Sequence, residues 1–523
     1  MYTLNPRRCR LFPLLILLCL PVTALFAQGK LSIDKVYTAY LQSSGPIMEK
    51  GQVKGYFFLY QSDKIDKTTN EYTLQILDEN LNRIKSIKFD DSKDISLLEA
   101  AYNGSTIAFL FRNEEGKTLD LKVYDFSGKL KYTYSNELDK RSEEMIKQFG
   151  LGVHGEAGGN RLVFDIGERG YVSVTPLKDG KARTYQVDIY SSQSKKQWSY
   201  LPADDQGKFS YAEYLGCTDS LVVLQVFRAN NMFGNDATSH IVGINFVTRK
   251  KQFDIKSDDE KNPFAPTNIV AIEGTHNLMA IGPYFEKENN PLKDASKGLE
   301  VCEITTTGQI VSKTLNSWAG DFSKFLPINN AKGKIDGIGY LYIHKVIRTP
   351  DQRTFIVGEG YKREASALGI ATTLMGHYNG VTKIVITDLV IMEFDDHFKV
   401  QNATVYDKTN NTAVAGSMSD INSQHGLAVD LKAMGAFDYE FTTGEDDNSN
   451  FAVCYSDWVR SSDYKGQTFN SIRYNGKKFI SDKIELKSKA TSLRVLPGKA
   501  GTIMIIEYFK KDKRLELRLE KLG

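Results

Sequence analysis

The stretch "LKVYDFSGKLKYTYS", residues 121–135, alternates apolar and polar side chains on both sides of a short polar turn. Period-two alternation around Asp, Ser and Gly is typical of two antiparallel strands joined by a hairpin turn. Upstream, "ISLLEAAYNGSTIAFLF", residues 95–111, contains two further strand-like runs separated by a small-polar break. The two stretches together predict one unit of four antiparallel strands.

The unit recurs along the chain. Hairpins of the first kind occupy residues 74–89, 185–201, 241–255, 299–315, 389–406 and 469–486, and upstream pairs occupy 211–227, 268–285 and 491–509. Repeats of about 40–60 residues built only of strands are typical of a β-propeller. The sequence therefore predicts an all-β fold, a single β-propeller of about eight four-stranded antiparallel blades. Seven blades is the alternative, because the third and seventh units are the least clear.

The two ends of the chain predict how the ring closes. The last unit, "LELRLEKLG", ends at Gly523 after its third strand. A surplus strand, "LSIDKVYTAYL", lies at residues 31–41, ahead of the first full unit. Pairing this N-terminal strand with the last blade would close the ring and cover both exposed sheet edges.

The N-terminus predicts export. Residues 1–27 comprise a start with three arginines, an apolar stretch over 11–22 and a small-residue exit. This pattern is typical of a secretory signal peptide, which leaves a β-propeller domain at 28–523; cleavage after Ala24 is the alternative. The expected location is periplasmic, outer-membrane-associated or extracellular. No transmembrane span is expected, because no later run reaches the roughly 18 apolar residues that a bilayer requires.

Charge and cysteine content exclude several classes of protein. The chain has 67 Lys and Arg, three of them in the signal peptide, so 64 remain against 64 Asp and Glu. A neutral chain argues against nucleic acid as a partner. Cys217, Cys302 and Cys454 lie far apart in sequence and without a CxxC pair, so we expect buried, unpaired thiols.

A resemblance supports the fold. The stretch "KIVITDLVIMEFDDHFKV", residues 383–400, is similar to a motif of exported β-propeller-like proteins of Gram-negative bacteria. Those proteins form a domain-of-unknown-function family. The resemblance implies a propeller and a place in the cell envelope, and it implies no reaction and no catalytic residue.

Three predicted insertions interrupt the repeat, at residues 137–160, 359–383 and 409–438. The second contains an uncharged stretch at 365–382, which we interpret as a structural plug, with a ligand-pocket lining or a partner surface as alternatives. Its polar side chains are candidate ligand-binding residues: Tyr361, Lys362, Arg363, Glu364, His377 and Tyr378. The aromatic residues Trp318, Trp458 and Tyr464 lie in predicted loops, where they could stack on sugars or anchor a partner. Packing between blades is the alternative that we favour for these three.

Catalytic motifs are sparse. The seven histidines form no HExxH or other paired ligand spacing, and no GxSxG elbow is present, so no metal, cofactor or catalytic residue is predicted. "GLGVHG", residues 150–155, lacks the strand-turn-helix context of a dinucleotide site. Four carboxylates near the second insertion leave glycoside chemistry open: Glu359, Glu364, Asp388 and Glu393.

The sequence favours an exported, non-enzymatic binding or scaffolding protein of the cell envelope, which binds an envelope protein or a glycan on one propeller face. The alternative is a carbohydrate-active hydrolase or lyase on the same fold, and a purely structural module is a third interpretation. An enzyme should gather two or more carboxylates or histidines into one open pocket. A binding module should instead show exposed aromatic residues without that convergence.

Overall fold

The computed structural model describes the greater part of the chain: residues 29–49, 51–138, 146, 161–179, 182–202, 209–231, 236–257, 262–272, 274–328, 333–367, 381–413, 424–445, 447–499 and 501–522. The predicted signal peptide, most of the first insertion and the centre of the second, with His377 and Tyr378, lie outside these residues.

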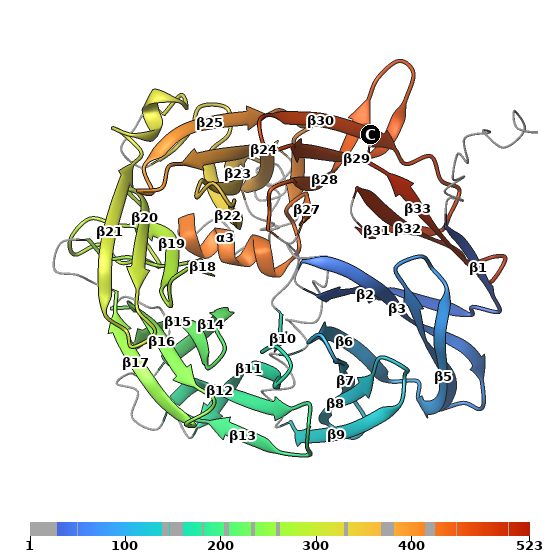
Figure 1. Ribbon diagram of the computed structural model, residues 1–523. Helices are drawn as coiled ribbons and strands as arrows, with labels where there is room; N and C mark the ends of the chain where they lie inside the picture. The colour runs from blue at the N-terminus through green and yellow to red at the C-terminus, as the bar shows by residue number, and fades with distance from the viewer. Residues whose placement is uncertain are drawn as a thin grey trace, which may run out of the picture.

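The described strands form four-stranded antiparallel meanders that stand around a common centre (Figure 1). The first blade contains β2 (Thr38–Glu49), β3 (Gln52–Lys64), β4 (Thr69–Asp78) and β5 (Arg83–Ser92). The second contains β6 (Ile95–Tyr102), β7 (Thr106–Asn113), β8 (Thr118–Asp125) and β9 (Leu130–Glu137). The third contains β10 (Val163–Asp165), β11 (Gly170–Asp179), β12 (Ala182–Ser191) and β13 (Gln197–Tyr200). The fourth contains β14 (Phe209–Cys217), β15 (Leu221–Ala229), β16 (Thr238–Asn245) and β17 (Lys250–Lys256).

The second half of the chain continues the pattern. The fifth blade contains β18 (Asn268–Ala271), β19 (Leu278–Tyr284), β20 (Gly298–Ile304) and β21 (Ile310–Ser317), and a short 3-10 helix, η3 (Phe322–Lys324), follows it. The sixth contains β22 (Tyr340–Arg348), β23 (Thr354–Ala365), β24 (Thr382–Phe394) and β25 (Val400–Tyr406), with the extra strand β26 (Asn411–Ala413) and helix α3 (Gln424–Ala433) after it. The seventh contains β27 (Tyr439–Gly444), β28 (Phe451–Arg460), β29 (Lys465–Tyr474) and β30 (Phe479–Glu485). The eighth contains β31 (Ser492–Pro497), β32 (Thr502–Phe509), β33 (Arg514–Lys521) and β1 (Lys30–Asp34).

Eight blades are therefore present among the described residues, including the third and seventh units that were least clear in the sequence. The third and fourth blades join into one eight-stranded sheet through a single parallel pairing, Arg183 with Phe209. The predicted pairing of the chain ends is also present, because Ile33 of β1 lies opposite Leu515 of β33. The surplus strand is shorter than predicted: it ends at Asp34, and Thr38 already begins the innermost strand of the first blade.

The hydrophobic core lies between neighbouring blades. One cluster joins Tyr56 and Phe58 of the first blade to Met504 and Ile506 of the eighth. Equivalent clusters fill the other blade interfaces, because alternate side chains of each central strand face opposite neighbours. The three cysteines that the structure describes are unpaired, as expected; Cys302 and Cys454 are buried and Cys217 is half-buried.

The turn quoted first in the sequence is used repeatedly. The Asp125 carboxylate accepts the backbone N–H of Lys129 at 2.9 Å, and Gly128 takes a φ of 81°. The Asp395 carboxylate accepts the N–H of Lys399 at 2.8 Å in the same way, although Phe398 occupies the glycine position with a φ of 61°. An aspartate that holds the backbone four residues on explains why the turn tolerates a residue other than glycine.

The insertions share one face of the ring. In a four-stranded meander, the connection between the second and third strands and the connection to the next blade lie at the same edge. The insertions after β9, β23 and β25 are connections of these two kinds, so their strand ends lie on one face. Figure 1 shows α3, from the third insertion, inside the ring of blades. No helix in the described part of the chain combines the length and apolar character needed to cross a membrane.

Candidate functional site

The polar residues predicted for the second insertion lie in a strand, which corrects the predicted boundary of that insertion. β23 continues to Ala365, and β24 begins at Thr382. Tyr361 is buried, and its hydroxyl donates to the backbone carbonyl of Gln424 at 2.9 Å. Glu364 pairs with Lys362 and with Lys383, both at 3.2 Å, on the surface of the sheet. The predicted insertion was too long because polar residues such as "YKRE" are equally typical of a loop and of the exposed end of a strand.

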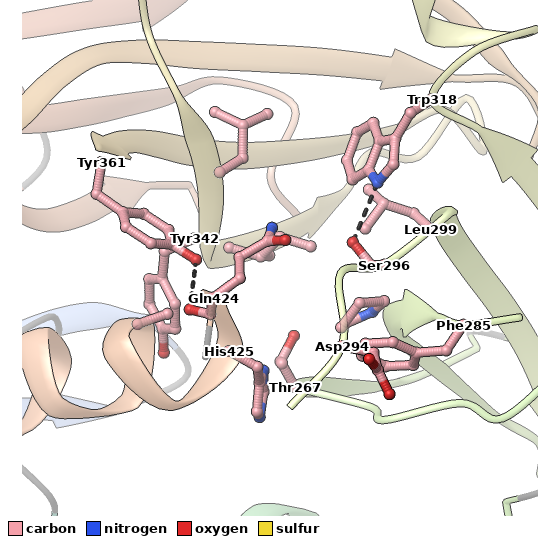
Figure 2. A pocket seen from close by; sticks show the side chains of 14 residues that line it. Thr267, Phe285, Asp294, Ser296, Leu299, Trp318, Tyr342, Tyr361, Gln424 and His425 are labelled. Atoms are coloured by element: carbon pink, nitrogen blue, oxygen red, sulfur yellow. Dashed lines mark hydrogen bonds between the residues drawn. The ribbon is translucent and has the colours of Figure 1, made fainter. Parts of the chain in front are cut away.

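Trp318 and Tyr361 lie at one small cavity between the fifth and sixth blades and α3 (Figure 2). The cavity has a volume of about 40 Å³. The Trp318 indole N–H donates to the Ser296 hydroxyl at 3.1 Å, and Trp318 is buried. A space of this size holds a few water molecules and no sugar or peptide. Both aromatic residues therefore pack between structural elements, the alternative that the sequence left open for Trp318.

Trp458 lies on a much larger cleft at the insertion-bearing face. Its side chain is 52% exposed. β27 begins opposite Tyr455, so the β28–β29 hairpin continues beyond β27, and beyond that point no described strand pairs with this edge of β28. The resulting space, called here the Trp458 cleft, has a volume of about 630 Å³, within the range of ligand-binding sites. It is lined by Thr409, Asn410, Asn411, Asp438, Ser456, Asp457, Trp458, Arg460 and Gln467. Tyr464 lies in the turn of the same hairpin, where its hydroxyl donates to the Gln467 carbonyl at 2.6 Å.

Two carboxylates line the Trp458 cleft, and the segment that leaves the sixth blade connects them. Asp457 accepts the backbone N–H of Thr409 at 3.2 Å. Asp438 accepts a hydrogen bond from the side-chain amide of Asn411 at 2.9 Å and another from the ammonium of Lys408 at 2.5 Å. Residues 408–411 therefore hold both carboxylates at the wall of one open cleft.

Asp438 also belongs to a buried polar cluster, called here the Glu359 cluster, whose other members are His344, Glu359 and Lys408. The Glu359 side chain is fully buried, and the Lys408 ammonium lies 3.2 Å from its Oε1. His344 Nε2 donates to Glu359 Oε2 at 3.0 Å. The backbone N–H groups of Asp438 and Tyr439 donate to the two Glu359 oxygens at 3.1 Å each. Four donors thus satisfy this one buried carboxylate.

The cluster has one cation for two carboxylates, and the pKa values of these two carboxylates shift in opposite directions. Burial alone would raise the pKa of Glu359, but the hydrogen bond from His344, the Lys408 charge and the Tyr439 N–H lower it. Burial raises the pKa of Asp438 to about 6 against the opposing charge of Lys408. Burial would lower the pKa of Lys408, but the two carboxylates raise it. When the cluster takes up a proton as pH falls through about 6, that proton binds to Asp438, the member that reaches the cleft.

His344 is neutral in this arrangement. Burial lowers its pKa against the opposing effect of Glu359, and its ring stacks on Tyr439 with centroids 4.5 Å apart. Since Nε2 carries the proton donated to Glu359, Nδ1 carries a lone pair, and this atom is buried without a hydrogen-bond partner in the described structure. The ring therefore fixes Glu359 and contributes no charge. Within the described residues no group of three or more His, Cys, Asp or Glu side chains is arranged to hold a metal ion.

The raised pKa of Asp438 predicts a pH-dependent stability. The pKa of Asp438 in the unfolded chain is about 3.9, so the folded state binds the proton more tightly than the unfolded state does. The resulting stabilisation of the folded state is fully present below about pH 4 and is lost as pH rises through 6. Asp438→Asn has no proton to lose. We expect wild type and variant to be equally stable near pH 4, and the variant to be more stable at pH 8 by up to about 3 kcal/mol. Urea unfolding at both values measures the difference, and parallel pH profiles would contradict the assignment.

Sequence reasoning named one member of this site by its chemistry. Glu359 was among four carboxylates considered for glycoside chemistry, but the other three do not join it. Glu393 pairs with Arg353 at 3.0 Å, and Asp388 accepts the backbone N–H of Lys408 at 3.0 Å. Asp438, Asp457 and Lys408 had no motif to identify them. The one available signal was a pair of polar stretches, "DYE" at residues 438–440 and "SDW" at residues 456–458, which lie at the start of one strand and the end of the strand that faces it.

Comparison with known proteins identifies the family. The model of a family of unknown function, DUF6770, matches residues 9–523, so the chain belongs to that family. No curated protein matches the chain.

Several solved structures share the fold. A prolyl endopeptidase covers 90% of this chain at 9% identity and a TM-score of 0.41, and the match spans 55% of the endopeptidase. The β-propeller domain of the Trilobed protease from Pyrococcus furiosus covers 70% at 10% identity and a TM-score of 0.32, with 96% of that domain matched. The WD40 domain of SCAP from fission yeast covers 94% at 8% identity and a TM-score of 0.38, with 94% of that domain matched. The chain thus spans about half the length of the prolyl endopeptidase that it matches.

These comparisons correct the functional prediction. The non-enzymatic binding or scaffolding interpretation is contradicted, because the similar propellers belong mostly to enzymes, the prolyl oligopeptidases and the tricorn protease. Since identities of about a tenth describe likeness of fold, the reaction has to be argued from the residues of the Trp458 cleft.

Proposed function

We propose that this member of the DUF6770 family is a hydrolase that cleaves glycosidic bonds in the Trp458 cleft. The observation that supports the proposal is the pair of carboxylates in different environments at one aromatic-lined wall. Asp438 is partly buried with its pKa raised to about 6, whereas Asp457 is held by backbone N–H groups. Glycoside hydrolysis usually needs two carboxyl groups, one of which is a general acid with a raised pKa.

Each residue has a distinct role in the proposed reaction. Trp458 binds the apolar face of a sugar ring. Asp438 donates its proton to the glycosidic oxygen as the bond between that oxygen and the anomeric carbon breaks. Asp457 removes a proton from the water that forms the new bond to the anomeric carbon. The Glu359 cluster supports this chemistry, because burial in the cluster raises the pKa of Asp438 to about 6 and the Glu359 charge acts in the same direction.

The experiment is a binding and turnover assay on a glycan panel. The full-length protein is incubated with polysaccharides of different composition, and the release of reducing ends is measured. We expect Trp458→Ala to weaken binding of the cleaved glycan by about 10-fold to 100-fold, as expected for loss of one stacking platform. Phe325→Ala is the matched control, because Phe325 is also an exposed aromatic residue, 37% exposed, and does not line the cleft. Turnover of peptides in place of glycans, or equal effects of the two variants, would refute the proposal.

The proposal includes export to the envelope of a Gram-negative cell, where structural glycans are accessible. The basic, apolar and small-residue pattern of residues 1–27 supports it. N-terminal sequencing of the protein recovered from the envelope or the medium should give Gln28 as the first residue. An intact N-terminus on a protein retained in the cytoplasm would contradict export.

A further inference from the structure

The open end of the β28–β29 hairpin carries an unusual combination of side chains on one face. Arg460 follows Trp458 by two residues, so the two side chains leave the strand on the same side. In the register, Gln467 lies opposite Trp458, and Lys465 lies opposite Arg460. Directly opposite residues also share a face. An indole, an amide, a guanidinium and an ammonium are therefore presented together.

The two cations are placed at a cost to the sheet. Like charges directly opposite each other destabilise an antiparallel pair. Both side chains are exposed, and in the described part of the chain neither Arg460 nor Lys465 forms an ion pair. The nearby Lys487, in contrast, is paired with Glu485 at 2.7 Å. An anion bound between Arg460 and Lys465 would relieve the repulsion.

We infer that the Trp458 cleft selects glycans whose sugars carry carboxylate groups, as uronic acids do. The inference rests on the proposed function and deepens it. Trp458 stacks on one sugar ring, and the carboxylate of the same or the next ring binds between Arg460 and Lys465. A guanidinium donates two parallel hydrogen bonds to a carboxylate, which gives orientation as well as attraction. Neutral glycans would have the stacking contact alone.

The test measures binding by calorimetry. Oligogalacturonate is compared with the same oligosaccharide after reduction of its carboxyl groups to neutral alcohols. All proteins are full-length and carry Asp438→Asn, so that no sugar is consumed. We expect Arg460→Gln to weaken oligogalacturonate binding by about 10-fold to 100-fold and to leave binding of the neutral oligosaccharide unchanged. Lys483→Gln, at an exposed position of β30 away from the cleft, is the charge-matched control and should have no effect.

The outcomes separate this inference from the proposed function. Equal affinity for the two oligosaccharides, with no effect of Arg460→Gln, overturns the selection of acidic sugars. If Trp458→Ala still abolishes binding in that case, the glycan site itself remains supported. No binding of either oligosaccharide overturns both. Tighter binding of an oligoglutamate peptide than of oligogalacturonate also overturns both, because the cleft would then recognise acidic peptides.

Discussion

Replacing Lys408 with methionine is expected to lower the free energy of unfolding at pH 7 by about 3–5 kcal/mol, the usual cost of removing one partner from a buried ion pair. The Lys408 side chain is fully buried, and among the residues that the structure describes its ammonium is the single cation that forms ion pairs with Glu359 and Asp438. Methionine keeps the length of the apolar stem and removes the charge, so two carboxylates would face each other without compensation. Urea unfolding measures the loss.

Two further variants make this result specific. Lys383→Met removes a half-exposed lysine from its pair with Glu364 and should cost less than about 1 kcal/mol. Adding Asp438→Asn to Lys408→Met removes one of the two unpaired carboxylates and should restore part of the lost stability. If Lys408→Met behaves like Lys383→Met, the Glu359 cluster is not a closed, buried network.

The second large effect concerns turnover. Asp438→Asn is expected to lower kcat on a natural glycan by about 10²- to 10⁴-fold, because a general acid protonates the glycosidic oxygen as the bond breaks. Glycan binding should stay intact, because it does not require this proton transfer. Aryl glycosides with an acidic phenol as leaving group need little protonation, so their turnover should fall much less. The measurement is kcat and KM for both substrate types.

The pH profile adds a second readout for Asp438. A general acid must be protonated, so activity of the wild type should fall as pH rises through about 6. Asp438→Asn should lose this alkaline limb. A variant with normal kcat, or with a wild-type pH profile, would remove Asp438 from the reaction.

The fold was predictable because its signal is local and repeated. Stretches such as residues 121–135 specify strand, turn and register within 15 residues, and Asp125 and Gly128 determine the turn. Eight copies of this pattern predict the ring without any long-range information. The boundary of the second insertion was wrong because strand β23 simply continues into polar residues at its exposed end, where alternation no longer distinguishes strand from loop.

The candidate site was much less predictable, because it is assembled across blades. Glu359 and Asp438 are 79 residues apart in sequence and meet only when the sixth and seventh blades pack together. Of the seven candidate binding residues that the structure describes, Trp458 alone lines the Trp458 cleft, and it was identified from its side-chain chemistry. The pairing of two carboxylates through residues 408–411 depends on the path of a connection between blades, which no periodicity in the sequence describes.

The most direct test of the account is cleavage of a glycan in water enriched in oxygen-18, followed by mass spectrometry of the products. If the Trp458 cleft hydrolyses glycosidic bonds, each cleavage by the wild-type protein should place one heavy oxygen at a new reducing end. Products should be nearly absent with Asp438→Asn. Unchanged glycans after incubation with the folded wild-type protein, or equal labelling by wild type and Asp438→Asn, would contradict the account.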